Sequence, residues 1–243
     1  MNRAIMELTV RQILGAKRTL LLVAFALIPV LVAILFRTTG RDTKLDEWTA
    51  NTLYAGLIAT TLLPLVALVF GTAALGSEFE DGTAVYILAR PIPRWTIVVS
   101  KLTVAATATV ALVLFSSILS GIVASGGAGS IVSGFSIALA AGAVVYCCLF
   151  VCLSIVTSRA LIAGLIYVFL WEGVITSLFS GLQVFSVRQY VLGLADRIIS
   201  TNPATFSARL NGIEGGILMV AVAAVAVIIA VRRLKVWEIG ESS

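Results

Sequence analysis

Long apolar stretches alternate with short polar stretches along the whole chain. A transmembrane helix needs about 20 consecutive, mostly apolar residues. Six stretches come close to that length or exceed it, and they predict six spans at residues 19–36, 51–75, 93–124, 131–156, 161–180 and 215–231. The pattern therefore predicts an all-α integral membrane protein, with residues 1–243 forming a single transmembrane domain.

Composition and charge support this fold class and give the spans an orientation. Hydrophobic residues make up 60% of the chain and charged residues 12%, whereas a soluble domain is about half apolar and a quarter charged. Of the 17 Lys and Arg residues, 11 fall on the side of the membrane that carries both termini and six on the other. Lys and Arg are enriched in cytoplasmic loops. Both termini are therefore expected in the cytoplasm, which requires an even number of spans.

Several kinds of chemistry need residues that this chain lacks. There is no histidine, which removes histidine-based triads and the zinc sites that depend on histidine. There is no G-x-x-x-x-G-K-[S/T] motif, so the chain is not expected to have an ATPase site of its own. Cys147, Cys148 and Cys152 lie in one apolar run and are expected to pack as small apolar side chains rather than to hold a metal. We therefore expect no catalytic, cofactor-binding or metal-binding residues.

The basic residues lie at the ends of apolar runs rather than in one patch, which argues against nucleic-acid binding and for contact with membrane lipids. Residues 1–18 have a moderately amphipathic pattern, which favours a helix along the inner membrane surface. A solvated terminus is the alternative. Residues 181–214 are only half polar and are expected to form a partly buried outer segment, in which Arg188–Ile199 could be a helix at the outer surface.

The longest cytoplasmic loop, residues 76–100, has a pattern of its own. Asp81-Gly82 is a turn signal, and Thr83–Ala89 is mostly apolar but too short to span a membrane. Pro91 ends this piece. The pattern predicts a short helix that projects from the cytoplasmic face with exposed apolar side chains. Such a helix could dock a soluble partner, and a solvated surface loop is the alternative interpretation.

This loop resembles the one between the second and third spans of ABC transporter permeases of the ABC-2 type. The resemblance is carried by Glu78, Gly82, Thr83, Leu88, the Arg90-Pro91-Ile92-Pro93-Arg94 run and Lys101. The stretch from Leu170 to Gly173, followed by Ser186 and Tyr190, also looks like one branch of that family. The resemblance implies that the loop contains a coupling helix, and that a separate ATP-binding subunit docks on Glu78, Gly82, Thr83, Leu88, Arg90, Pro91 and Arg94.

The resemblance further implies a permease subunit of an ATP-driven exporter in a cell membrane, of prokaryotic origin. Two permease copies, identical or related, would pair with two ATP-binding subunits, and those subunits would bind the ATP and Mg. The sequence does not name the substrate. The alternatives are a non-transporting sensor or assembly factor that uses an ATPase partner, and a secondary transporter. A membrane enzyme is disfavoured, because the spans contain no pair of carboxylates.

Glu172 lies near the middle of the fifth predicted span. A carboxylate at that depth costs about 2.5–3.5 kcal/mol on insertion scales, so such residues usually pair or line a polar cavity. We expect either a structural pair, with Arg188 as the candidate partner, or a contact used in transport.

Overall fold

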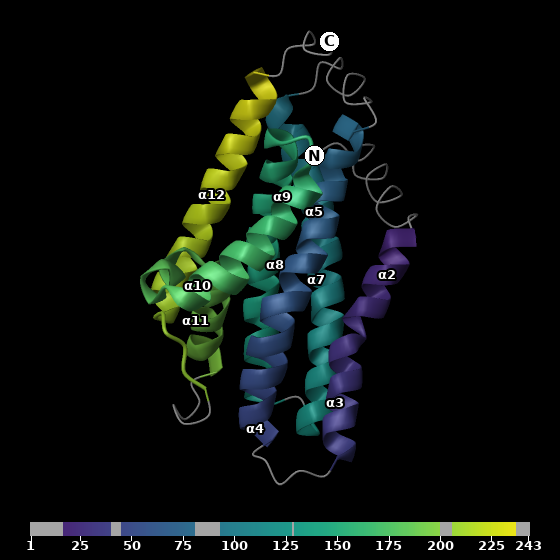
Figure 1. Cartoon of the computed structure of the whole chain (residues 1–243), viewed down its shortest axis with the longest axis vertical. Coiled ribbons are helices and arrows are strands. Elements are labelled where there is room, and N and C mark those ends of the chain that lie inside the picture. The colour runs from purple at the N-terminus through teal and green to yellow at the C-terminus, as the bar shows by residue number, and fades with distance from the viewer. Residues whose placement is uncertain (1–16, 40–44, 81–92, 128, 200–205, 237–243) are drawn as a thin grey trace.

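The computed structural model describes residues 17–39, 45–80, 93–127, 129–199 and 206–236 (Figure 1). Within these ranges all of the regular structure is helical, which confirms the predicted all-α class. Five of the helical stretches are long and apolar enough to cross a membrane: Thr19–Thr38, Leu45–Gly76, Arg94–Ser125, Ser130–Val156 and Gly212–Leu234. Exposed apolar side chains such as Leu31, Ile166 and Val220 cover the outside of the bundle. An apolar exterior of this kind is typical of a surface that faces lipid.

The first spanning stretch consists of two helices, α2 (Lys17–Ala26) and α3 (Ile28–Thr38), separated at Leu27. Pro29 lies in the first turn of α3, where its missing N–H group costs least. The Leu27 N–H group is shared between the carbonyl oxygens of Val23 and Ala24, both at 3.2 Å. Pro29 thus explains why the helix is interrupted near its centre.

The second stretch is one continuous helical rod with a change of winding. It begins with α4 (Leu45–Trp48), continues as the π-helix η1 (Thr49–Leu62) and ends as α5 (Leu63–Glu80). The π-winding gives way to α just before Pro64, and the Leu63 N–H group still bonds five residues back, to Ile58. π-Helical turns are rare and often occur at functional sites. Helix η1 is therefore one place to look for a functional site.

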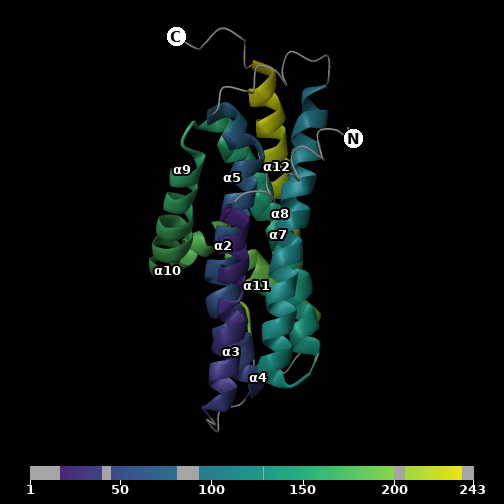
Figure 2. The ribbon, with the colours of Figure 1, turned by 90° about the vertical axis from the view of Figure 1, so that its right-hand side faces the viewer.

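Three long helices complete the bundle: α7 (Arg94–Ser125), α8 (Ser130–Val156) and α12 (Gly212–Val236). Helix α8 lies at the centre and packs against α5, α7 and α12 (Figure 2). The core of the bundle is mainly aliphatic and contains several large aromatic side chains. Tyr54, Phe135 and Tyr146 are fully buried, and the rings of Tyr54 and Phe135 stack with centroids 4.8 Å apart.

The fifth predicted span is shorter than the others. It consists of α9 (Ala160–Ile166), the π-helix η2 (Tyr167–Ile175) and α10 (Thr176–Leu178). Its apolar part, Ala160–Ile175, falls below the length of the other five stretches. With a rise of about 1.5 Å per residue it covers only about 24 Å, against about 30 Å for the hydrocarbon core. The number of full spans therefore stays a prediction.

After this short helix the chain forms a 3₁₀ turn, η3 (Ser180–Phe185), and then α11 (Val187–Ile199). Helix α11 packs on η1, α8 and α12. Irregular backbone at membrane depth is tolerated only where protein covers it, and this packing provides the cover. The ends of α5 and α12 lie at one end of the bundle, with the start of α7, while α3 ends and α4 begins at the opposite end (Figure 1).

Candidate functional site

The loop on which the sequence places ATPase docking lies mostly outside the described residues. Gly82, Thr83, Leu88, Arg90 and Pro91 all fall there, as does most of the predicted surface helix at residues 1–18. Glu78 belongs to the last turns of α5, but its side chain is also outside the description. Arg94 is the first residue of α7. The docking role of these residues thus stays a prediction.

The two helices that flank this loop are tied together by a buried lysine. Lys101, in the third turn of α7, is 1% exposed, and its Nζ donates a 2.7 Å hydrogen bond to the Ala74 carbonyl oxygen of α5. Burying an ammonium group is costly unless it is hydrogen-bonded. The contact therefore fixes the loop-facing ends of α5 and α7 relative to each other.

Glu172 is the centre of a buried hydrogen-bond network, and its side chain is only 3% exposed. Its Oε1 accepts hydrogen bonds from the Tyr167 hydroxyl at 3.1 Å and from the Val187 backbone N–H group at 3.0 Å. Its Oε2 accepts a 2.7 Å bond from the Ser186 hydroxyl. Three donors from η2 and from the start of α11 thus converge on one carboxyl group, which joins the short fifth helix to the segment that follows it.

Arg188 was the candidate partner of Glu172, and the structure shows both residues with other hydrogen-bond partners. The Arg188 Nη2 donates a 3.3 Å hydrogen bond to the Ala55 carbonyl oxygen in η1. Glu172 accepts from Tyr167, Ser186 and Val187 instead. The alternative idea, that Glu172 contacts a transported substrate, stays untested.

Tyr167 was missed at the level of sequence because it lies five residues before Glu172. Side chains five apart do not share a face of an α-helix, where neighbours are three or four apart. The π-winding of η2 (i→i+5) makes them neighbours. Ser186 was singled out only through the family resemblance. A hydroxyl near the start of the outer segment, just before a half-polar helix, is a weak signal on its own.

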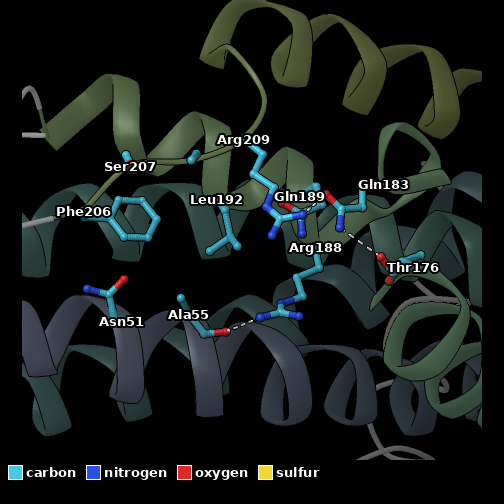
Figure 3. A pocket seen from close by; sticks show the side chains of 11 residues that line it. Asn51, Ala55, Thr176, Gln183, Arg188, Gln189, Leu192, Phe206, Ser207 and Arg209 are labelled. Atoms are coloured by element: carbon cyan, nitrogen blue, oxygen red, sulfur yellow. Dashed lines mark hydrogen bonds between the residues drawn. The ribbon is translucent and has the colours of Figure 1, made fainter. Parts of the chain in front are cut away.

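A polar cavity of about 370 Å³ lies between η1, η3, α11 and the segment before α12 (Figure 3). Its polar lining includes Asn51, Gln183, Arg188, Gln189, Ser207 and Arg209. The Arg209 Nη1 donates a 2.9 Å hydrogen bond to the Gln183 Oε1, and the Gln183 Nε2 donates a 3.0 Å bond to the Thr176 carbonyl oxygen. The cavity thus brings together two arginines that lie 21 positions apart in the sequence.

The cysteines are spread along one helix and do not form a cluster with acidic residues. Cys147 is fully buried in α8, and its Sγ lies 3.2 Å from the Thr109 hydroxyl of α7. Among the described residues, no three Cys, Asp or Glu side chains are placed to hold a metal ion. In the described helices, these thiols pack as core side chains.

An all-helical bundle with five described helical stretches long and apolar enough to cross a membrane defines a multi-pass membrane protein. A family model described as "ABC-2 family transporter protein" matches residues 16–188. The chain therefore belongs to the ABC-2 family and is a transmembrane subunit of an ABC transporter, which implies an ABC ATP-binding partner. A search of the curated proteins found no match. This match confirms the resemblance to ABC-2 permeases that was found in residues 76–100.

Proposed function

We propose that this chain is the permease subunit of an ATP-driven exporter, and that the ATP-binding subunit docks on residues 76–100. Membership of the ABC-2 family is the observation that carries the proposal. Two permease copies, identical or related, pair in the membrane with two ATP-binding subunits. Those subunits bind ATP and Mg, and the assembly resides in the plasma membrane of a prokaryotic cell. The substrate leaves the cell when ATP closes the partner subunits.

The flanking helices support a mechanical role for the loop. Glu78 lies near the end of α5, and Arg94 begins α7. The bond from Lys101 to the Ala74 carbonyl oxygen holds these two helix ends together. Both helices pack along α8 at the centre of the bundle. A displacement of the loop would therefore move two long spans together rather than be absorbed by one helix end.

The test places a charge or a proline in the loop. Leu88→Asp adds a carboxylate to a surface expected to be an apolar contact, and Gly82→Pro removes a backbone N–H group at the expected turn. Leu45→Asp is the matched control, because Leu45 is 46% exposed at the opposite end of the bundle. The readout is the amount of ATP-binding subunit that copurifies with the tagged chain, and the ATPase activity of the purified complex.

We expect both loop variants to insert normally and to lose most of the copurifying subunit or its permease-dependent activity. Glu78→Ala should have a milder effect. Leu45→Asp should behave like the unchanged chain. If both loop variants bind and hydrolyse normally, the docking assignment is wrong, and residues 1–18 become the next candidate for the contact.

A further inference from the structure

We propose that the cavity lined by Arg188 and Arg209 is a binding site for an oxyanion, a phosphate group in particular. Neither the docking loop nor the ATP-binding subunit enters this proposal. The cavity volume of about 370 Å³ is in the range of small-molecule sites, about 300–1,000 Å³. It is therefore large enough for a phosphate with part of the molecule attached to it.

The charge of the cavity is unbalanced. Two arginines line it, and its lining contains no Asp or Glu. Within the described part of the chain, neither guanidinium forms an ion pair, and the polar contacts found for them are with the Ala55 carbonyl oxygen and the Gln183 Oε1. Two acids lie close to the cavity but do not line it. Glu172 accepts its three bonds, and Asp196 accepts one from the Ala208 backbone N–H group.

Each arginine keeps donors available for a ligand. A guanidinium has five N–H donors, and one hydrogen bond per arginine is accounted for above. The Arg188 Nε is buried, so the nitrogens that can reach a ligand are the terminal ones of Arg188 and Arg209. These nitrogens can donate to one shared oxyanion, because guanidinium N–H groups match the geometry of phosphate oxygens.

The arginines are held in place before any ligand arrives. Gln183 is 8% exposed and bridges Arg209 to the Thr176 carbonyl oxygen. Arg188 is anchored on η1, whereas Arg209 enters from the segment before α12, as Figure 3 shows. Groups that are fixed in the binding geometry lose less conformational entropy on binding. The amide of Gln189 lines the same space and adds an uncharged donor.

The position of the cavity relative to the membrane suggests which phosphates can reach it. Arg209 lies three residues before α12, which begins at Gly212 and is long enough to span. The end of a span lies near the polar head groups of the bilayer, and Leu192 and Phe206 give the cavity an apolar wall. The phosphate can therefore come from a lipid head group or from a soluble anion, and the experiment must separate these two sources.

The experiment measures binding to the purified chain in a neutral detergent. The probes are short-chain phosphatidic acid, inorganic phosphate and, as an uncharged control, short-chain diacylglycerol. Three variants are compared with the unchanged chain: Arg209→Gln, the double variant with Arg188→Gln, and Arg233→Gln. Arg209 is exposed, so its replacement should not disturb folding. Arg233 is an exposed arginine near the other end of α12 and serves as the matched control.

We expect phosphatidic acid to bind the unchanged chain and Arg233→Gln equally, and diacylglycerol to bind neither. Losing a charged hydrogen bond weakens binding by about tenfold or more, so Arg209→Gln should bind at least about tenfold more weakly and the double variant more weakly still. Inorganic phosphate binding as tightly as phosphatidic acid would support the site with a soluble source, and weaker phosphate binding would support a lipid source. If neither anion binds, or if the arginine variants bind as the unchanged chain does, the proposal is wrong.

Discussion

The Glu172 network makes the sharpest quantitative prediction for stability. Glu172→Ala removes an acceptor that serves Tyr167, Ser186 and the Val187 backbone N–H group. Hydrogen bonds between membrane helices contribute about 0.6 kcal/mol on average and up to about 1.7 kcal/mol. Two of the three bonds join separate elements and the one from Tyr167 lies within η2; taken at this size, the three together correspond to about 2–5 kcal/mol. The Val187 N–H group cannot rotate to find another acceptor, so we expect the loss to lie within this range.

Glu172→Gln should be much milder. The remaining carbonyl oxygen can take the position of Oε1 and keep the bonds from Tyr167 and Val187. The new amide N–H₂ group then faces the Ser186 hydroxyl, which can accept instead of donate. Only the charge assistance of these bonds is lost, which is about 1 kcal/mol.

The assay is the apparent melting temperature of the purified chain in detergent, followed by size-exclusion chromatography after heating. One kcal/mol shifts the melting temperature by about 2–4 °C for a domain of this size. We therefore expect Glu172→Ala to melt about 4–20 °C lower and Glu172→Gln about 2–4 °C lower. Glu214→Ala is the control, because Glu214 is exposed and accepts one 3.4 Å bond from Asn211.

Two results would refute this reasoning. If Glu172→Ala melts no lower than the Glu214→Ala control, the carboxyl group does not hold the fifth helix to α11. If Glu172→Gln is as damaging as Glu172→Ala, the negative charge itself matters, and an ion pair rather than the three hydrogen bonds stabilises the site.

Three further predictions follow from the packing and the charge pattern. In Gly193→Ala the new Cβ would lie 2.8 Å from a backbone carbonyl oxygen of the segment before α12, so the free energy of unfolding should fall by about 1–3 kcal/mol. Gly216→Ala is the control, because its Cβ meets nothing within 4 Å. Equal melting temperatures for the two variants would contradict the close approach at Gly193. Lys101→Met removes the bond to the Ala74 carbonyl oxygen together with the cost of burying an ammonium, so the free energy of unfolding should change by no more than about 1 kcal/mol; a loss of several kcal/mol would mean that the ammonium is net stabilising. In a background without the natural cysteines, a cysteine at Lys44 should react with an impermeant reagent in intact cells and one at Arg159 should not, and the reverse would overturn the orientation.

The sequence predicts the helices well because burial in lipid leaves a strong signal. Runs of apolar residues must satisfy their backbone groups internally, so the long helices α7, α8 and α12 follow directly from hydropathy. The sequence also allowed a helix at Arg188–Ile199, and the structure has α11 there with buried residues along it. The local sequence pattern is therefore sufficient to predict a helix wherever the buried side chains recur at the α-helical spacing of three or four residues.

The candidate sites were harder to predict because they depend on departures from that period and on distant contacts. Glu172 could be recognised as a buried acid, but its partner Tyr167 becomes a neighbour only through the π-winding of η2. The cavity combines Asn51, Arg188 and Arg209 from three separated segments. No local pattern in the sequence relates these residues. They become neighbours only in the folded structure.

The most direct test of the central claim is the composition of the complex that the chain forms in its native membrane. A tagged chain is purified from those membranes into nanodiscs, and the mass of the particle is measured. It should carry an ABC ATP-binding subunit, with two copies of each chain in the particle. Closed two-fold pairs are the commonest oligomer symmetry, and paired permeases are the basis of the proposed mechanism. Recovery of the chain without any ATP-binding subunit, or as a stable and active particle with one copy of each, would contradict the account.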